Sequence, residues 1–209
     1  LHNVAHSFPT RRSSDLPKVR SVYVIRPVFG GTYDGDVWFA GNHGAAMWNQ
    51  AAGRIIEHQT VAIDVGGAFM DGDFFGLGFD AAGDVWIGGA HRSGRINYAT
   101  NGGDFFAPID PVVDVWPDAD ELNRTDDHIK ALAVDTAGDV WFGSLVNGLR
   151  RHQVGSVSCQ DVALPTGLGP GVSALAADPD GTIWVGTWTG LGRYDPAADT
   201  WNVIRHMGS

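Results

Sequence analysis

The segment Gly138-Asp139-Val140-Trp141-Phe142 decides the fold, because a phrase of this kind occurs at four places in the chain. The other three copies are Gly35-Asp36-Val37-Trp38-Phe39, Gly83-Asp84-Val85-Trp86-Ile87 and Gly181-Thr182-Ile183-Trp184-Val185. Their tryptophans are 48, 55 and 43 residues apart. A repeat of roughly 40–50 residues with turn glycines and short apolar runs is typical of a β-propeller. The sequence therefore predicts an all-β protein of about four four-stranded blades.

Alternating apolar segments and turn residues divide each repeat into strands. The fourth repeat is the clearest, with strands expected at 172–177, 182–186, 191–194 and 200–204. The same division places the four blades at about 20–59, 74–109, 128–160 and 172–204. The first blade departs from the pattern, because Thr32 stands where the others have the turn-opening Asp80, Asp135 or Asp178. Pro27 also falls near its inner strand, where the missing N–H is unfavourable.

Residues 1–16 differ from the rest of the chain and are predicted to be a non-native segment, with a native polar arm as the alternative. The stretch from His6 to Leu16 resembles the translation of a sequencing-adapter oligonucleotide. Residues 17–209 are assigned to the propeller repeats. Because four blades are the lower limit for a closed propeller, we expect this array to be part of a larger one, with the remaining blades elsewhere in the full-length protein.

The charge balance excludes several classes of partner. The net charge is −10, and Lys18 and Lys130 are the only lysines. Binding to nucleic acid or to an anionic membrane surface needs clustered basic residues, so we expect neither contact from this segment. Cys159 is the only cysteine and has no disulfide partner within the chain. No run of apolar residues approaches the length of a transmembrane helix.

The repeated residues are predicted to be structural. A tryptophan at the same place in every repeat indicates packing between neighbouring blades rather than ligand contact. Asp residues at the repeated turns are expected to bond their own backbone two residues on, and the spacing of an EF-hand calcium loop is absent. These turn residues are Asp80, Asp135, Asp178 and Asp180. No metal site and no cofactor is predicted.

The segment from Asp178 to Pro196 resembles the two-component regulator propeller repeat, through the pattern Asp-x-x-Gly-x-Ile-Trp-Val-Gly-Thr-x-x-Gly-Leu-x-Arg-Tyr-Asp-Pro. The run from Asp126 to Leu132 is similar to that family's entry into the inner strand. The resemblance extends over residues 20–204 and is strongest in the last two repeats. It implies a periplasmic or extracellular sensor propeller, often followed by a membrane helix and a histidine kinase. A downstream signalling domain is therefore expected in the full-length protein.

The irregular parts of the repeats indicate where a ligand would bind. The second-to-third turns and the blade-to-blade links 60–73, 110–127 and 161–171 are expected on one face, opposite the regular turns. Variable loops on a rigid scaffold commonly carry function. The candidate ligand-binding residues on this face are His91, Arg92, Trp116, Asp127, His128 and Trp188.

Two chemistries are open for these residues. In one interpretation of the link 110–127, Trp116 stacks on a sugar and the acidic residues around it bind hydroxyl groups or a cation. In the other, the link is an ordinary solvated loop. His91, Arg92 and Trp188 would hold an anionic or sugar ligand, since Arg forms a planar fork and Trp a flat apolar face.

We expect a non-enzymatic module that senses a small-molecule or oligosaccharide ligand. No Gly-x-Ser-x-Gly, His-Glu-x-x-His or phosphate-binding glycine loop is present, so no catalytic residue is assigned. Two alternatives remain. Gluconolactonase-like and streptogramin-lyase-like propellers share the Asp-x-x-Gly-x-x-Trp core, and a lyase would use a histidine such as His128. A protein-interaction scaffold is the second alternative, because propellers host all three functions.

Overall fold

The computed structural model describes residues 21–42, 44–59, 74–89, 93–103, 109–113, 129–156 and 158–204. Within these ranges the chain forms four antiparallel sheets of four strands each, and the strands of each sheet are consecutive in the sequence. The all-β propeller of about four four-stranded blades is therefore confirmed.

The strands of blade 1 are β1 (Val22–Pro27), β2 (Val37–Gly41), β3 (Gly44–Asn49) and β4 (Arg54–Gln59). Those of blade 2 are β5 (Phe74–Phe79), β6 (Val85–Gly89), β7 (Ser93–Ile96) and β8 (Ile109–Val113). Those of blade 3 are β9 (Ile129–Val134), β10 (Val140–Ser144), β11 (Gly148–His152) and β12 (Cys159–Val162). Those of blade 4 are β13 (Val172–Ala177), β14 (Ile183–Thr187), β15 (Gly190–Asp195) and β16 (Thr200–Ile204).

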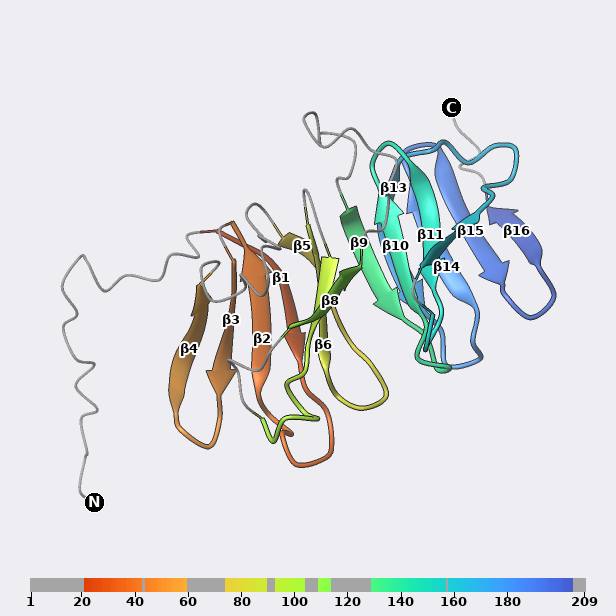
Figure 1. The fold of residues 1–209 in the computed structure, drawn as a ribbon. Helices are drawn as coiled ribbons and strands as arrows, with labels where there is room; N and C mark the ends of the chain where they lie inside the picture. Colours follow the sequence, from red (N-terminus) through yellow and green to blue (C-terminus); the bar gives the residue numbers. More distant parts are fainter. Residues whose placement is uncertain are drawn as a thin grey trace, which may run out of the picture.

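The four blades stand side by side in chain order, from blade 1 on the left of Figure 1 to blade 4 on the right. The first strands of successive blades, β1, β5, β9 and β13, contact one another. β4 and β16 lie at opposite ends of the row (Figure 1). The array therefore has two end faces, one on blade 1 and one on blade 4.

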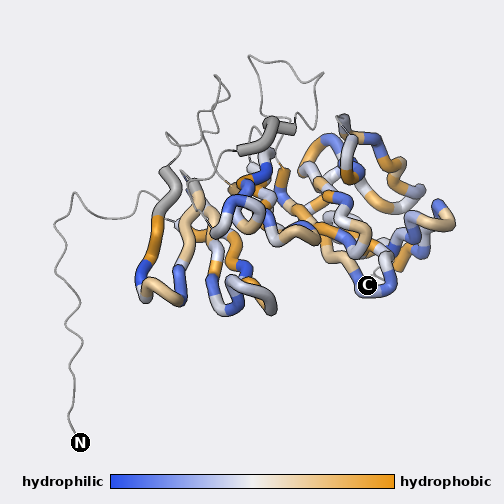
Figure 2. Tube along the Cα trace, turned by 60° about the horizontal axis from the view of Figure 1, so that its bottom comes forward, coloured by the Kyte–Doolittle hydropathy of each residue, from blue (hydrophilic) through white to orange (hydrophobic). Residues whose placement is uncertain are grey.

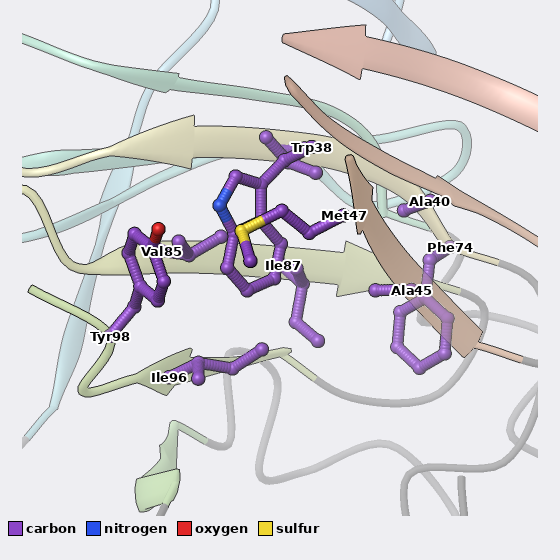
Figure 3. Close-up of a cluster of buried hydrophobic side chains, with 10 residues drawn as sticks. Trp38, Ala40, Ala45, Met47, Phe74, Val85, Ile87, Ile96 and Tyr98 are labelled. Atoms are coloured by element: carbon purple, nitrogen blue, oxygen red, sulfur yellow. The ribbon is translucent and has the colours of Figure 1, made fainter. Parts of the chain in front are cut away.

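The core lies between the blades, because successive side chains of a strand point to opposite faces of its sheet. In β10, Phe142 packs against Trp86 of blade 2, whereas Trp141 packs against Ile183 and Val185 of blade 4. Figure 3 shows the same arrangement between blades 1 and 2, where Trp38 and its neighbours meet residues of β6 and β7. Figure 2 shows hydrophobic stretches along the strands and hydrophilic residues at many turns. Each blade thus depends on its neighbours for its buried surface.

The first turn of blade 1 corrects a prediction. Counting back from the tryptophan placed Thr32 opposite Asp80, but the hydrogen bonds place Val28 there. The Val28 amide donates to Asp36 O at 2.8 Å, as the Asp80 amide donates to Asp84 O at 3.0 Å. The turn is therefore four residues longer in blade 1 than in blade 2. Pro27 ends β1 and pairs in register with Val37.

The bounds of two links also differ from the prediction. β12 (Cys159–Val162) covers the first two residues of the link 161–171. Residues 110–127 were assigned to the connection between blades 2 and 3, but β8 covers Ile109–Val113. Asp110 pairs in register with Arg95 of β7. Asp110 is thus part of the outer strand of blade 2, and the rest of this acidic link lies outside the described residues.

Candidate ligand-binding face

The regular turns use their aspartates to build the blade. Asp135 Oδ1 accepts hydrogen bonds from the amides of Ala137 at 2.9 Å and Asp139 at 3.0 Å. Its Oδ2 accepts one from the indole Nε1 of Trp141 at 2.9 Å. The carboxylate therefore ties the turn to the tryptophan that follows six residues later, and the predicted turn role is confirmed.

The same arrangement recurs in blades 2 and 4. Asp80 accepts from the amides of Ala82 and Asp84, both at 3.0 Å, and from Trp86 Nε1 at 3.2 Å. In blade 4 the roles are divided. Asp178 accepts from the Trp184 indole at 3.3 Å, and Asp180 accepts from the Thr182 amide at 2.9 Å.

A second repeated acid joins the two turns of blades 1, 2 and 3 at this end, whereas blade 4 has Thr182 at the same position. Asp84 is buried and accepts from the amide of Thr100 at 2.9 Å and from its hydroxyl at 2.8 Å. Asp139 accepts from the Val154 amide at 2.8 Å. Because these carboxylates are already bound by the blade's own donors, the end with the regular turns is a structural face.

The predicted ligand face lies at the opposite ends of the strands, and the structure describes one of its six candidate residues. His91, Arg92, Trp116, Asp127 and His128 lie outside the described residues. Trp188 is described, in the turn between β14 and β15, and its side chain is 78% exposed. Whether the other five approach Trp188 stays a prediction.

The indole of Trp188 is held against the link between blades 3 and 4. A Cβ atom placed on Gly171 would lie 2.8 Å from Trp188 Cδ1 and 2.6 Å from the backbone oxygen of Leu145. Only a glycine leaves room for this contact. Thr189 secures the same link, because its hydroxyl accepts from the Gly169 amide at 2.6 Å and donates to Gly167 O at 3.2 Å. The exposed indole is therefore fixed at its edge by the neighbouring backbone.

A pocket of about 380 Å³ is formed by this link together with β11 and β12. Its apolar walls come from β11, β12 and the link, and its polar groups come from Asn147 and Asp161. Asp161 also forms an ion pair with Arg150. The lining residues of the link itself are Ala163, Leu164, Leu168 and Pro170.

Sequence reasoning placed this link on the candidate face but assigned no residue in it to the site. The available signal was its content of proline and glycine, with Pro165 and Pro170 beside short apolar residues. Proline and glycine residues indicate a chain turn with restricted backbone angles, but they do not indicate that a pocket forms next to it. That depends on how far β12 and β11 stand from the link.

No described ionisable group with a shifted pKa lies on this face: Tyr98, His152 and Tyr194 lie between blades, and Asp180 lies in a regular turn at the opposite end. Burial lowers the pKa of His152, whose ring lies 5.4 Å from that of Trp86. Burial, together with a hydrogen bond to Asp199, raises the pKa of Tyr194 to about 12. In the part of the chain that the structure describes, no three His, Cys, Asp or Glu side chains are grouped to hold a metal ion.

Comparison with known families finds one match, which covers part of blade 4 and the link before it. The pattern described as two component regulator propeller matches residues 166–189, from the link through β13 and β14 to the turn that bears Trp188. The chain contains a two-component regulator propeller repeat. The matched regulator repeat begins in the link, so it includes both the Thr189 contacts and the exposed indole. No curated protein matches the chain by sequence.

Solved structures with similar folds come from several functional classes. The chain superposes on the extracellular domain of the putative hybrid two component system BT3049 from B. thetaiotaomicron with a TM-score of 0.66 and 16% identity, covering 93% of this chain and 25% of that one. Virginiamycin B lyase from Staphylococcus aureus gives 0.65 and 16%, covering 93% and 58%. Saccharomyces cerevisiae Sqt1 gives 0.64 and 14%, covering 87% and 48%.

These likenesses show the propeller fold, which this chain shares with the extracellular domain of a two component system and with a lyase. The chain spans 58% of the lyase's length and a quarter of that extracellular domain's. Among the described residues, no helix is long and apolar enough to cross a membrane.

Proposed function

We propose that this chain is a non-enzymatic, extracytoplasmic sensing module that binds a sugar-containing ligand on the face bearing Trp188. The observation that carries the proposal is the exposed indole beside the pocket lined by Asn147 and Asp161. The regulator repeat and the likeness to a two-component extracellular domain support a sensing role.

The geometry of Trp188 suits stacking on a sugar ring. An indole offers a flat apolar surface, and its edge contact with Gly171 limits the number of orientations that it can adopt. Fixing a side chain before the ligand arrives reduces the entropy lost on binding. The turn is also secured by the Thr189 hydroxyl, so stacking would require little rearrangement.

The pocket supplies the complementary polar chemistry. Ligand sites are commonly concave and apolar, with a few polar groups that orient the ligand. Asn147 and the exposed carboxylate of Asp161 stand at a wall otherwise formed by Leu164, Leu168 and Pro170. A carboxylate and an amide are suitable partners for sugar hydroxyl groups.

The test is calorimetric titration of the chain with a panel of neutral and acidic oligosaccharides. For a sugar that binds, Trp188→Ala should weaken the affinity by about tenfold or more, as expected for an aromatic anchor. Phe29→Ala is the matched control, because Phe29 is an exposed aromatic residue at the opposite, regular-turn end of the blades. Equal affinities for the wild type and Trp188→Ala would reject this site.

Two further assays separate the two alternatives, one for turnover and one for a protein partner. Turnover of a lactone or of virginiamycin B that needs a divalent metal and disappears in His128→Ala would show an enzyme. A stoichiometric protein partner, with no stabilisation by any small ligand, would indicate a scaffold.

The proposal includes the context of the module. We expect further blades and a downstream signalling domain in the full-length protein, with this segment in the periplasm or outside the cell. Long-read sequencing across both ends of the locus tests this. Additional Asp-x-x-Gly-x-x-Trp repeats followed by a membrane helix and a kinase would agree with it. An upstream export signal with a stop codon soon after residue 209 would contradict it.

A further inference from the structure

The long first turn of blade 1 forms a pocket with the first turn of blade 2, at the end of the strands opposite Trp188. The pocket encloses about 550 Å³, which is within the range of about 300–1,000 Å³ that small-molecule sites occupy. Its walls come from two neighbouring blades inside the row, so it does not depend on what adjoins either end of the array.

The turn of blade 1 is held in place as one wall of this pocket. Asp34 Oδ1 accepts a hydrogen bond from the Gly30 amide at 2.6 Å, which fixes the tip of the turn. The ring of Tyr33 packs against that of Tyr98 in blade 2, with the centroids 4.9 Å apart. A Cβ atom on Gly103 would lie 2.3 Å from Tyr33 Cε1, so the same ring also contacts the backbone of blade 2. A wall that is already ordered reduces the entropy lost when a ligand binds.

Three aromatic side chains line the pocket: Phe29, Tyr33 and Phe79. Phe29 is 85% exposed, whereas Tyr33 and Phe79 are half-buried against the core between blades 1 and 2. The side chains between them are small, with alanines at 81, 82 and 99. The face of an aromatic ring carries partial negative charge and attracts a cation within about 6 Å of its centroid. The pocket therefore combines apolar surface with an affinity for positive charge.

Blade 1 lacks an arginine that the other three blades share. In blades 2, 3 and 4 the residue paired in register with the repeated tryptophan is an arginine, which forms an ion pair with an aspartate at the regular-turn end of its own blade. These pairs are Arg95 with Asp80, Arg151 with Asp139 and Arg193 with Asp180. In blade 1 the same position is Met47, which is buried beside Trp38 (Figure 3).

The buried carboxylate of Asp36 in blade 1 forms no ion pair within the described ranges. Its hydrogen bonds come from neutral donors: the Gln50 amide at 2.8 Å, the Asn49 side-chain amide at 3.3 Å and the Tyr98 hydroxyl. Water and salt screen a buried charge less than an exposed one, so its field extends further. Because Tyr98 packs against Tyr33, this negative charge lies directly behind the pocket wall.

A second negative charge stands at the rim of the pocket. Asp34 is exposed, in the turn that forms the wall. Asp80 is part of the wall itself, but Arg95 lies 3.7 Å away and compensates its charge. Arg26, the arginine that precedes the turn, donates to the backbone of its neighbour at 3.0 Å. The net field at the pocket is therefore negative.

We propose that this pocket binds a small organic cation, an ammonium group carried on an apolar body. The ammonium group lies over the rings of Phe29 and Tyr33, in the field of Asp34 and Asp36, and takes the part that the arginine plays in the other blades. The apolar body packs against Phe79 and the alanines. This site is separate from the sugar-binding face at the other end of the strands, and neither proposal depends on the other.

Calorimetric titration of the 209-residue chain with three probes of similar shape tests the proposal. The probes are 2-phenylethylammonium, the neutral 2-phenylethanol and the anionic phenylacetate. We expect the ammonium to bind about tenfold or more tightly than the alcohol, because only the cation gains from the ring faces and the carboxylates. Phenylacetate should not bind. Equal affinities for the ammonium and the alcohol, or no binding of the ammonium, would overturn the proposal.

Two truncations locate the site. Phe29→Ala should weaken binding of 2-phenylethylammonium by about tenfold, and the fold should be retained because Phe29 is exposed. Trp188→Ala is the matched control, since it removes an exposed aromatic residue at the opposite end of the strands and should leave this affinity unchanged. Wild-type affinity in Phe29→Ala, or an equal loss in Trp188→Ala, would place the cation elsewhere.

Two further variants test the charge. Asp36→Asn and Asp34→Asn should each weaken binding of the ammonium and leave the affinity for 2-phenylethanol unchanged. Circular dichroism reports whether Asp36→Asn keeps its fold, and Asp34→Asn is exposed, so its result does not depend on a buried group. Unchanged affinity for the ammonium in the folded variants would overturn the role of the carboxylates.

Discussion

The indole of Trp141 meets the ring of Tyr194 in the next blade edge-on, with the ring centroids 5.8 Å apart and the ring planes at 71°. The corresponding pair between blades 1 and 2 is Trp38 and Tyr98, at 5.1 Å and 79°. Between blades 2 and 3, His152 takes the place of the tyrosine. The repeated tryptophan is thus one half of an aromatic pair, and the next blade provides the other half.

Truncating the tryptophan should therefore cost more inside the array than at its end. Burial of a tryptophan contributes up to about 4–6 kcal/mol, and its loss from a core typically costs about 3–5 kcal/mol. We expect Trp141→Ala to reduce the free energy of unfolding by about that amount and Trp184→Ala by less than half of it. Urea unfolding of the wild type and of each variant measures both losses. Equal losses would show that the neighbouring blade adds nothing.

The turn aspartate should be required for stability, because its carboxylate accepts three hydrogen bonds. Asp135→Ala leaves the buried indole N–H of Trp141 and two amides without that acceptor, which should cost about 2–4 kcal/mol in the free energy of unfolding. Asp178→Ala is the matched control, since its indole bond is 3.3 Å long and its tryptophan is half-buried. Thermal unfolding should show the larger loss for Asp135→Ala, and the reverse order would contradict this account.

The buried carboxylate of Asp36 should be sensitive to the loss of a single hydroxyl group. The Tyr98 hydroxyl donates to Asp36 Oδ2, and burial with this contact raises the pKa of Tyr98. Tyr98→Phe removes a hydrogen bond to a charged group, so the free energy of unfolding should fall by about 1.5–3 kcal/mol. Tyr23→Phe, at an exposed tyrosine, should change it by less than about 0.5 kcal/mol. An unchanged stability in Tyr98→Phe would show that the hydroxyl is not needed.

The pKa of His152 predicts a loss of stability in acid. Its pKa in the folded chain is lowered from the usual 6.5, first by burial and also by the charge of Arg95, while a hydrogen bond that the ring donates to the Ser158 backbone and the charge of Asp139 act in the opposite direction. As the pH falls through 6.5, the unfolded chain binds a proton before the folded chain does, so the folded state loses stability from that pH downward.

His152→Tyr removes this titration and introduces the residue found at the equivalent position of blade 4, Tyr194. The free energy of unfolding, measured by urea denaturation between about pH 8 and pH 5, should fall less steeply in the variant than in the wild type. Parallel curves would show that His152 does not titrate differently in the two states.

The glycine two residues after the repeated tryptophan should be required for stability in a blade that has another blade packed against it. A Cβ atom on Gly143 would lie 2.4 Å from Val172 Cγ1 of blade 4, so Gly143→Ala should cost about 1–3 kcal/mol of stability through overpacking. Gly186 holds the same position in blade 4, where the nearest atom, Ala174 Cβ, is 3.2 Å away and belongs to the same blade. Gly186→Ala should be nearly neutral in urea unfolding. A cost as large as that of Gly143→Ala would contradict the role of the interface.

The sequence alone determined the blades, because the period of the tryptophans and the turn residues are local patterns. The strand β9 at Ile129–Val134 and the turn at Asp135 follow directly from them. Counting back from the tryptophan chose the wrong residue as the start of the first turn of blade 1, because this turn is longer than the others. Only the hydrogen bonds show that Val28 opens it.

For the candidate site, the sequence identified the face and named Trp188, but not the pocket beneath the link. Five of the six named residues lie outside the described part of the chain, so their grouping stays a prediction. A cavity forms only when separate segments pack at a distance, which no local pattern records.

Only the tertiary structure decided how deeply the repeated tryptophan of each blade is buried. Trp141 and Trp184 occupy the same place in the same phrase, yet one is buried and the other half-buried. Residue type and spacing set which face of a strand a side chain occupies. Burial depends on what is packed against that face, and in this chain the next blade decides it.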